Sequence, residues 1–282
     1  MFRRRCDADR ASRCEASTST SDESGAARSF KARGRRDGSF TVVIPALNEE
    51  SRVSAAISSA KHPKATIIVV DGGSSDNTVR VARAGGVKVV RCDKGRAKQM
   101  NHGAATAGRG GGAKDDDDDD ILVFLHADST LPVDYYDLVM RELNNPRGRR
   151  SKDWGAFKFK MSADQSGGLG LRALLRCAIE FGTNARSKVF GMPYGDQALV
   201  VRKKTFEKVG GFDELPFMED YVMAQKLQKH GAPTIFEGEV TTSARRWDNR
   251  GFAKVTFVNQ LIVLGYHCGI PLGTLADWYR KV

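Results

Sequence analysis

The chain has 282 residues, 40% of them hydrophobic, which is enough apolar material for a sizeable core. It carries 45 Lys and Arg against 34 Asp and Glu, a formal net charge of +11. That charge suits phosphate-bearing ligands as well as an ordinary solvated surface. The sequence has no stripe of Lys and Arg interleaved with aromatic residues, so we expect no nucleic-acid partner.

The first 38 residues contain no hydrophobic periodicity, and their composition predicts a disordered leader. They are rich in Arg and Ser, as an organelle transit peptide is, although acids such as Asp7 and Asp9 depart from that pattern. Two interpretations stay open: targeting to a plastid or mitochondrion, or an unimportant tail on a cytoplasmic protein. We expect residues 39–282 to form one domain.

Cysteine usage and hydropathy limit the compartment and the relation to membranes. The five cysteines are scattered and lack CxxC spacing, which favours reduced thiols over a zinc site or disulfides. The most apolar segment, 255–272, includes Asn259, Gln260 and His267, so it is a poor candidate to span a bilayer. We therefore expect a soluble chain with no transmembrane segment, and a peripheral membrane contact stays open.

From residue 40 onward the sequence alternates between short β-branched runs and helix-like segments. The predicted strands are 40–44, 66–70, 87–90 and 121–125, and the predicted helices are Glu49–Ala60, Asp76–Ala84 and Gly95–Ala107. This order predicts an α/β fold with a mostly parallel central sheet flanked by helices. Its ligand crevice should lie at the carboxyl ends of the strands. The acidic run 115–120 is read as a solvated insertion.

Polar residues follow three of these strands. Pro45 is expected to end the first strand, and Asn48 to cap the helix after it. Asp71 follows the second strand, where a carboxylate can accept hydrogen bonds from a base or ribose. Asp128 follows the fourth strand in a His126-Ala127-Asp128 triplet and is a candidate ligand for Mg²⁺ or Mn²⁺. Each motif alone is equally well explained as helix capping or loop structure.

Together these motifs form an ordered set that continues to the end of the chain. The set comprises VVIPALNEE (42–50), VVDGGSSDNT (69–78), GRAKQMNHGA (95–104), FLHADSTLP (124–132), WGAF (154–157), GMPYGDQALVVRK (191–203), VGGFDELPFMEDYVMAQKLQKHG (209–231) and TSARRW (242–247). It resembles family 2 glycosyltransferases, most closely compact bacterial-type members without membrane helices. The resemblance implies the GT-A fold, a Rossmann-like sheet continuous with an acceptor-binding half in a single domain.

The resemblance also implies roles for single residues. Asp220, in the Met218-Glu219-Asp220 triplet, takes the place of the family's general base. Asp128 takes the place of the metal ligand in the DxD motif, whose first Asp is His126 here. The donor-binding residues are then Pro45, Asn48, Glu49, Asp71, Lys94, Arg96, Gln99 and Asp128, with Glu49 and Asp71 on the base and ribose. A helix-terminal acid that stabilises the dipole is the alternative for Asp220.

The acceptor side is expected to come from the second half of the chain. Its predicted residues are Tyr194, Gly195, Asp196, Glu219, Arg246 and Trp247. Ser243–Trp247 resembles a shortened form of the family's QxxRW segment, in which Trp stacks on a sugar and Arg clamps a phosphate. A structural Trp that packs on an Arg stem is the alternative.

The function expected is transfer of a sugar from a nucleotide-sugar donor to a hydroxyl-bearing acceptor, inverting and assisted by Mg²⁺ or Mn²⁺. Two other functions stay open. A sugar nucleotidyltransferase usually has a Gly-rich loop with a basic residue after the first strand, and PALNEE (45–50) does not fit that pattern. A non-catalytic nucleotide- or sugar-binding module would not need both Asp128 and Asp220.

Overall fold

The computed structural model describes residues 38–107, 120–144, 152–162 and 170–281. The chain divides into two units, Met1–Arg36 and Asp37–Val282, and the described residues all belong to the second. The predicted leader and the acidic run up to residue 119 lie outside the described residues.

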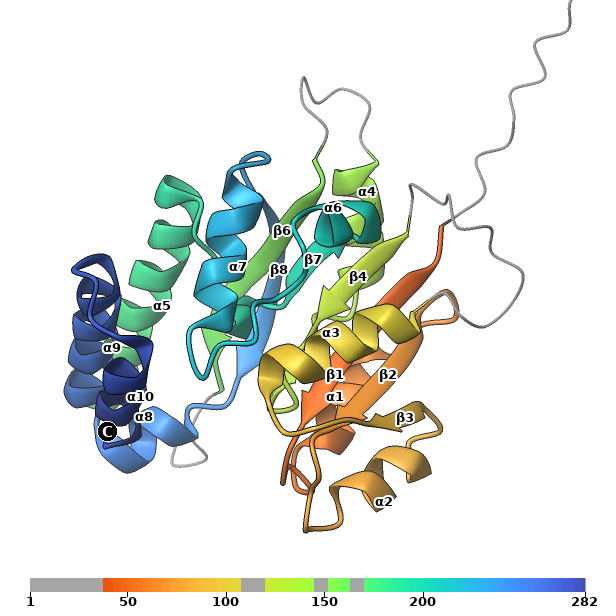
Figure 1. Cartoon of the computed structure of the whole chain (residues 1–282), viewed down its shortest axis with the longest axis horizontal. Coiled ribbons are helices and arrows are strands. Elements are labelled where there is room, and N and C mark those ends of the chain that lie inside the picture. The colour runs from red at the N-terminus through yellow and green to blue at the C-terminus, as the bar shows by residue number, and fades with distance from the viewer. Residues whose placement is uncertain (1–37, 108–119, 145–151, 163–169, 282) are drawn as a thin grey trace, which may run out of the picture. The chain divides into compact units, whose positions relative to one another are not determined.

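The second unit is built on one eight-stranded sheet with the strand order β3-β2-β1-β4-β7-β6-β8-β5 (Figure 1). The strands are β1 (Phe40–Ala46), β2 (Thr66–Asp71), β3 (Lys88–Arg91), β4 (Ile121–Phe124), β5 (Ser129–Thr130), β6 (Trp154–Met161), β7 (Leu199–Arg202) and β8 (Thr234–Thr242). The helices are α1 (Val53–Ala60), α2 (Thr78–Ala84), α3 (Arg96–Thr106), α4 (Tyr135–Leu143), α5 (Leu171–Phe190), α6 (Lys203–Lys208), α7 (Glu219–Gln228), α8 (Arg245–Arg250), α9 (Phe252–His267) and α10 (Leu272–Arg280), with a 3₁₀ turn, η1 (Gly195–Gln197).

The first four long strands pair in parallel, as predicted. β1 pairs with β2 and β4, and β2 pairs with β3, all parallel. β7 then joins antiparallel to both β4 and β6, and β6 pairs in parallel with β8. Four of the seven strand pairs are therefore parallel, so the sheet is mixed and mostly parallel.

Side chains alternate across the sheet and bury its two faces under different helices. Val42 and Ile44 of β1 point to a core shared with α1 and α4. Val43, between them, points to a second core shared with α3, α6 and α7. Both faces are thus covered, which explains why these strands read as nearly continuous apolar runs rather than as alternating ones.

Two details of the first strand and its loop differ from the sequence-based expectation. Pro45 does not end β1 but lies inside it, in register with Val70 of β2. Asn48 is not the cap of α1, whose cap position is Arg52. Instead its side-chain oxygen accepts the Ser75 backbone N–H at 2.9 Å, which ties the loop after β1 to the loop after β2. The local sequence around an Asn that bridges two loops looks the same as the sequence around an Asn that caps a helix, so the two roles could not be told apart.

The C-terminal helices lie beyond β6 and β8, on the side of the sheet away from β3 (Figure 1). α5 packs against β6, and α9 packs against α5, α8 and α10. In the described part of the chain no helix is both long enough and apolar enough to cross a bilayer.

Candidate functional site

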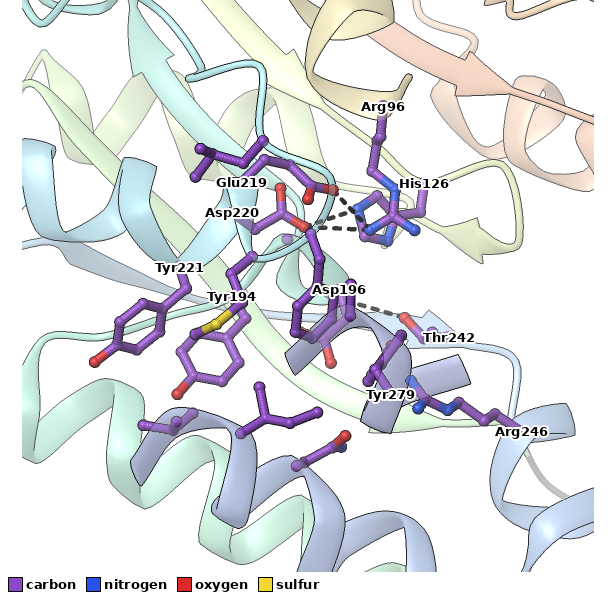
Figure 2. A pocket seen from close by; sticks show the side chains of 18 of the residues that line it. Arg96, His126, Tyr194, Asp196, Glu219, Asp220, Tyr221, Thr242, Arg246 and Tyr279 are labelled. Atoms are coloured by element: carbon purple, nitrogen blue, oxygen red, sulfur yellow. Dashed lines mark hydrogen bonds and ion pairs between the residues drawn. The ribbon is translucent and has the colours of Figure 1, made fainter. Parts of the chain in front are cut away.

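A cavity of about 860 Å³ lies between the sheet and the C-terminal helices (Figure 2). Its floor is formed by residues just after β3 and β4 and at the end of β8, among them Arg96, His126 and Thr242. Its opposite wall comes from α5, α9 and α10. A cavity at the carboxyl ends of β3, β4 and β8 agrees with the expected position of the ligand crevice.

Four charged or ionisable side chains from three elements meet on one side of this cavity, as Figure 2 shows. Asp220 Oδ2 lies 3.5 Å from His126 Nε2 and 3.6 Å from an Arg96 guanidinium nitrogen. The same Arg96 nitrogen lies 3.1 Å from Glu219 Oε1. Asp220 thus lies between a guanidinium and an imidazole. The Arg96 side chain is 53% exposed, so its guanidinium is still accessible to a ligand.

The local backbone explains how two acids come to lie at this point. Glu219 and Asp220 occupy the first turn of α7, where the helix dipole favours negative charge. The preceding residue, Met218, has a φ of 68°, which only tertiary contacts can impose on a residue with a long side chain. The turn therefore carries strain next to the cavity, as is common at functional sites.

The position of the Asp220 carboxylate also depends on the absence of a side chain at Gly195. A Cβ at position 195 would lie 2.2 Å from Asp220 Oδ2 and 2.4 Å from its Cγ, well inside van der Waals contact. The φ of Gly195 is not in the positive region, so the backbone alone does not require glycine here. What requires it is the close approach of the Asp220 carboxylate to η1.

The electrostatics of the cluster favour an ion pair. Burial raises the pKa of Asp220, but His126 and Arg96 outweigh that effect and leave it below its usual value. Burial likewise lowers the pKa of His126, but Asp220 outweighs it and leaves the pKa above its usual value. For Glu219, burial and the charge of Asp220 raise the pKa. The cluster therefore keeps Asp220 ionised and favours protonated His126.

Asp128 and Asp196 bring further oxygens to the same cavity. The only hydrogen bond at the Asp128 carboxylate among the described residues is a long one from the Ser129 hydroxyl, at 3.4 Å. One carboxylate oxygen of Asp196 is buried and has no hydrogen-bond partner among them, and burial raises the pKa of Asp196. Within the described ranges, no three His, Cys, Asp or Glu side chains are grouped so that they could hold a metal ion by themselves.

The residues expected at the nucleotide end lie outside the lining of this cavity. Asp71 is fully buried, and its carboxylate accepts the backbone N–H groups of Gly73 and Ser74 and pairs with Arg91 at 3.4 Å. Glu49 is closer to the site, because its carboxylate lies 3.5 Å from Arg245, which does line the cavity. Pro45 and Asn48 are not among the lining residues.

Lys94 and Arg96 line the cavity as expected, but Gln99 does not. The Gln99 amide nitrogen donates to the backbone oxygens of Ala46 and Val70, each at 2.8 Å, and the side chain is buried. Its donors therefore join the ends of β1 and β2. In this structure the Gln99 amide donors are therefore directed at the backbone and not at the cavity.

The predicted acceptor residues all line the cavity: Tyr194, Gly195, Asp196, Glu219, Arg246 and Trp247. Arg246 stacks on the ring of Tyr279 in α10 with its guanidinium carbon 3.6 Å from the ring centroid. Burial, with smaller contributions from Arg250 and Arg96, lowers the pKa of Arg246 to about 10. The indole of Trp247 packs near Phe159 of β6.

Arg186 and Tyr279 are among the lining residues that sequence reasoning missed. Arg186 of α5 lies over the ring of Tyr194 at 3.5 Å and donates to the Met192 backbone oxygen. Tyr279 comes from α10, near the end of the chain. Neither belongs to a motif with a recognisable spacing, and only the packing of α5 and α10 beside η1 and α8 brings them to the cavity.

Residues 41–150 match the family model described as Glycosyl transferase family 2. A comparison with curated proteins finds no match. Among solved structures, the chain is similar to S. aureus TarS 1-349 in complex with UDP-GlcNAc, with 14% identity and a TM-score of 0.50, covering 72% of this chain and 58% of that one. This chain therefore spans less than two thirds of the TarS fragment.

Two mycobacterial structures are also similar. One, described only as a mycobacterial protein, has 19% identity and a TM-score of 0.50 and covers 84% of this chain and 77% of its own. The other is glucosyl-3-phosphoglycerate synthase from Mycobacterium tuberculosis in complex with Mn²⁺ and UDP-Glc, with 20% identity, a TM-score of 0.49 and coverage of 83% and 80%. At these identities the TarS fragment and the first mycobacterial protein show the fold alone, which is GT-A-like.

Proposed function

Since residues 41–150 match the model of glycosyl transferase family 2, we propose that the chain transfers a sugar from a nucleoside diphosphate sugar to a hydroxyl group of an acceptor, with inversion at the anomeric carbon. The observation that carries this proposal is the position of Asp220. It is a half-buried carboxylate, 16% exposed and with a pKa held below its usual value, at the wall of a cavity that Asp128, Arg96 and the predicted acceptor residues also line.

In the proposed reaction the acceptor oxygen attacks the anomeric carbon as the bond from that carbon to the diphosphate oxygen breaks. The hydroxyl proton passes to Asp220, and the nucleoside diphosphate leaves with the bonding electrons. General-base assistance of this kind contributes about 10²–10⁴-fold to a rate. Asp220 is ionised and so ready to accept the proton, and Arg96 and His126 fix its orientation.

The leaving diphosphate gains negative charge, and the cavity offers cations to stabilise it. Lys94 and Arg96 follow β3 at the cavity floor, and Arg245 approaches Glu49 from α8. We propose that the donor lies between these elements, with its base and ribose toward Glu49 and the loop after β2, whose backbone the Asp71 carboxylate holds in place.

The residues present fit a divalent cation only together with the diphosphate. Asp128 offers a carboxylate with a single weak hydrogen bond among the described residues, and Asp196 offers a buried oxygen without a partner there. The remaining ligands would have to be diphosphate oxygens and water. When bound, Mg²⁺ or Mn²⁺ would act as a Lewis acid on the departing diphosphate. His126, in the place of a second Asp, instead pairs with Asp220.

The experiment is incubation of the purified chain with a panel of nucleotide-sugars and simple acceptors, with and without Mn²⁺. UDP-sugars come first, because the TarS fragment is a UDP-GlcNAc complex. We expect release of nucleoside diphosphate, a product of inverted configuration, and a loss of about 10²–10⁴-fold in the Asp220→Asn variant. Asp134→Asn changes an exposed acid that does not line the cavity; it is the matched control and should keep full activity.

Release of pyrophosphate from a nucleoside triphosphate and a sugar phosphate would instead identify a nucleotidyltransferase. Tight donor binding with no turnover would identify a binding module. Either result would overturn the proposal, as would wild-type turnover by a folded Asp220→Asn protein.

A further inference from the structure

Outside the cavity, α5 and α9 carry large apolar side chains that are exposed to solvent. Leu171, Leu174 and Phe181 of α5 are 72%, 67% and 77% exposed, large values for apolar side chains. Their spacing of three and then seven residues places them along one face of a 20-residue helix. Val189, also exposed, extends this stripe toward the end of the helix.

α9 repeats the pattern. Phe257, Leu261 and Leu264 are exposed and lie at positions i, i+4 and i+7, so they also share one helix face. The two helices pack against each other and lie on the same side of the sheet, with α10 and its half-exposed Trp278 beside them (Figure 1). Single exposed apolar residues are ordinary, but two such sets on helices that pack against each other indicate an interaction surface.

The charge on these helices indicates which partner fits. α5 and α9 carry the exposed cations Arg172, Lys188 and Lys254. The other cations of α5 do not face outward in this way, because Arg186 lines the cavity and Arg176 pairs with Asp248. The single acid of α5, Glu180, is turned toward β6, where it accepts the Met161 backbone N–H at 2.7 Å. α9 contains no acid and one lysine, Lys254. Exposed apolar stripes on helices whose exposed charges are cations are typical of helices that lie in the interface of an anionic bilayer.

We propose that the exposed faces of α5 and α9 dock on the surface of an anionic phospholipid membrane, with the chain held peripherally by apolar side chains and lysine or arginine contacts to headgroups. A second copy of this chain would bring two basic surfaces together, so charge complementarity favours the membrane. The same helices form a wall of the cavity through Thr183 of α5 and Asn259 of α9, so docking would place the cavity close to the bilayer.

The test is vesicle co-sedimentation of the full chain. Vesicles of phosphatidylcholine alone are compared with vesicles that contain phosphatidylserine in addition, at low and high salt. We expect binding to the anionic vesicles, little binding to the neutral ones, and weakening by salt. A variant with Leu174→Gln, Phe181→Gln, Phe257→Gln and Leu264→Gln should bind at least about tenfold more weakly, because it removes the inserted apolar side chains.

Val133→Gln is the matched control, since Val133 is fully exposed but lies away from these helices, before α4. It should bind vesicles as the wild type does. All four substituted side chains are exposed, so the variant should keep its melting temperature. The proposal is overturned if the wild type does not bind anionic vesicles, or if the fourfold variant binds them as well as the wild type does. It is also overturned if light scattering shows that the wild type is a dimer and that the fourfold variant is a monomer. None of these readouts depends on sugar transfer.

Discussion

Gly195→Ala tests the placement of Asp220 more sharply than any change to the acid itself. The added Cβ would lie 2.2 Å from Asp220 Oδ2, whereas an ordinary contact begins near 3.4 Å. The carboxylate, or η1 beneath it, must therefore move by about 1 Å. A displacement of that size at a reacting group costs about 10²-fold in rate. The crowding should also cost about 1–3 kcal/mol of folding stability.

The assay is steady-state transfer with the donor identified by the panel, together with thermal unfolding. Gly182→Ala is the matched control, because Gly182 lies in α5 with open space around its missing Cβ. It should leave turnover unchanged and stabilise the helix slightly. We expect Gly195→Ala to lower kcat far more than it changes KM. Full turnover by a folded Gly195→Ala protein would refute the argument that close approach to η1 positions the base.

Three further predictions follow from the same cluster and from the sheet. Asp220→Asn should lower the pKa of His126, because the largest interaction that favours the protonated imidazole is removed while burial and Arg96 still disfavour it. NMR titration of the imidazole measures this, and an unchanged midpoint would contradict the ion pair. Asp220 has a pKa below 3.8 in the folded state, so its contribution to the free energy of unfolding is present above pH 3.8 and is lost as the pH falls through the lowered value. Chemical denaturation should therefore show that the stability difference between the wild type and Asp220→Asn narrows in acid, and a constant difference would refute the assignment. Gly103→Ala should destabilise the fold by about 1–3 kcal/mol, because its Cβ would lie 2.3 Å from Val43; a denaturation midpoint equal to that of the wild type would show that α3 is not packed so closely on β1.

The first half of the fold could be predicted from the sequence because it is built from local units. Each strand there is a β-branched run, and each crossover has the length of a helix, so the parallel order follows from general rules. The second half could not be predicted in this way. β6 pairs with β8 across more than 70 residues, and β5 is a two-residue strand that pairs with the end of β8. Such pairings leave no periodic signal in the sequence.

Part of the candidate site could likewise be predicted from sequence motifs, and part of it depends on long-range packing. The sequence motifs predicted Asp128 and Asp220, and the structure places both at one cavity. It does not place Asp71 there, because the backbone N–H groups of its own loop and Arg91 occupy that carboxylate. Tyr279 reaches the cavity only through the packing of α10, which no short motif encodes. The sequence thus indicates which residue types are suited to the chemistry, while long-range packing decides which of them meet.

A crystal structure of the chain with a bound nucleoside diphosphate sugar tests the central claim most directly. The account predicts that the diphosphate lies against Lys94, Arg96 and Asp128, with the anomeric carbon facing the Asp220 carboxylate across a space that fits one hydroxyl group. A donor bound with its diphosphate away from Arg96 and Asp128, or with Asp220 turned from the anomeric carbon, would contradict it.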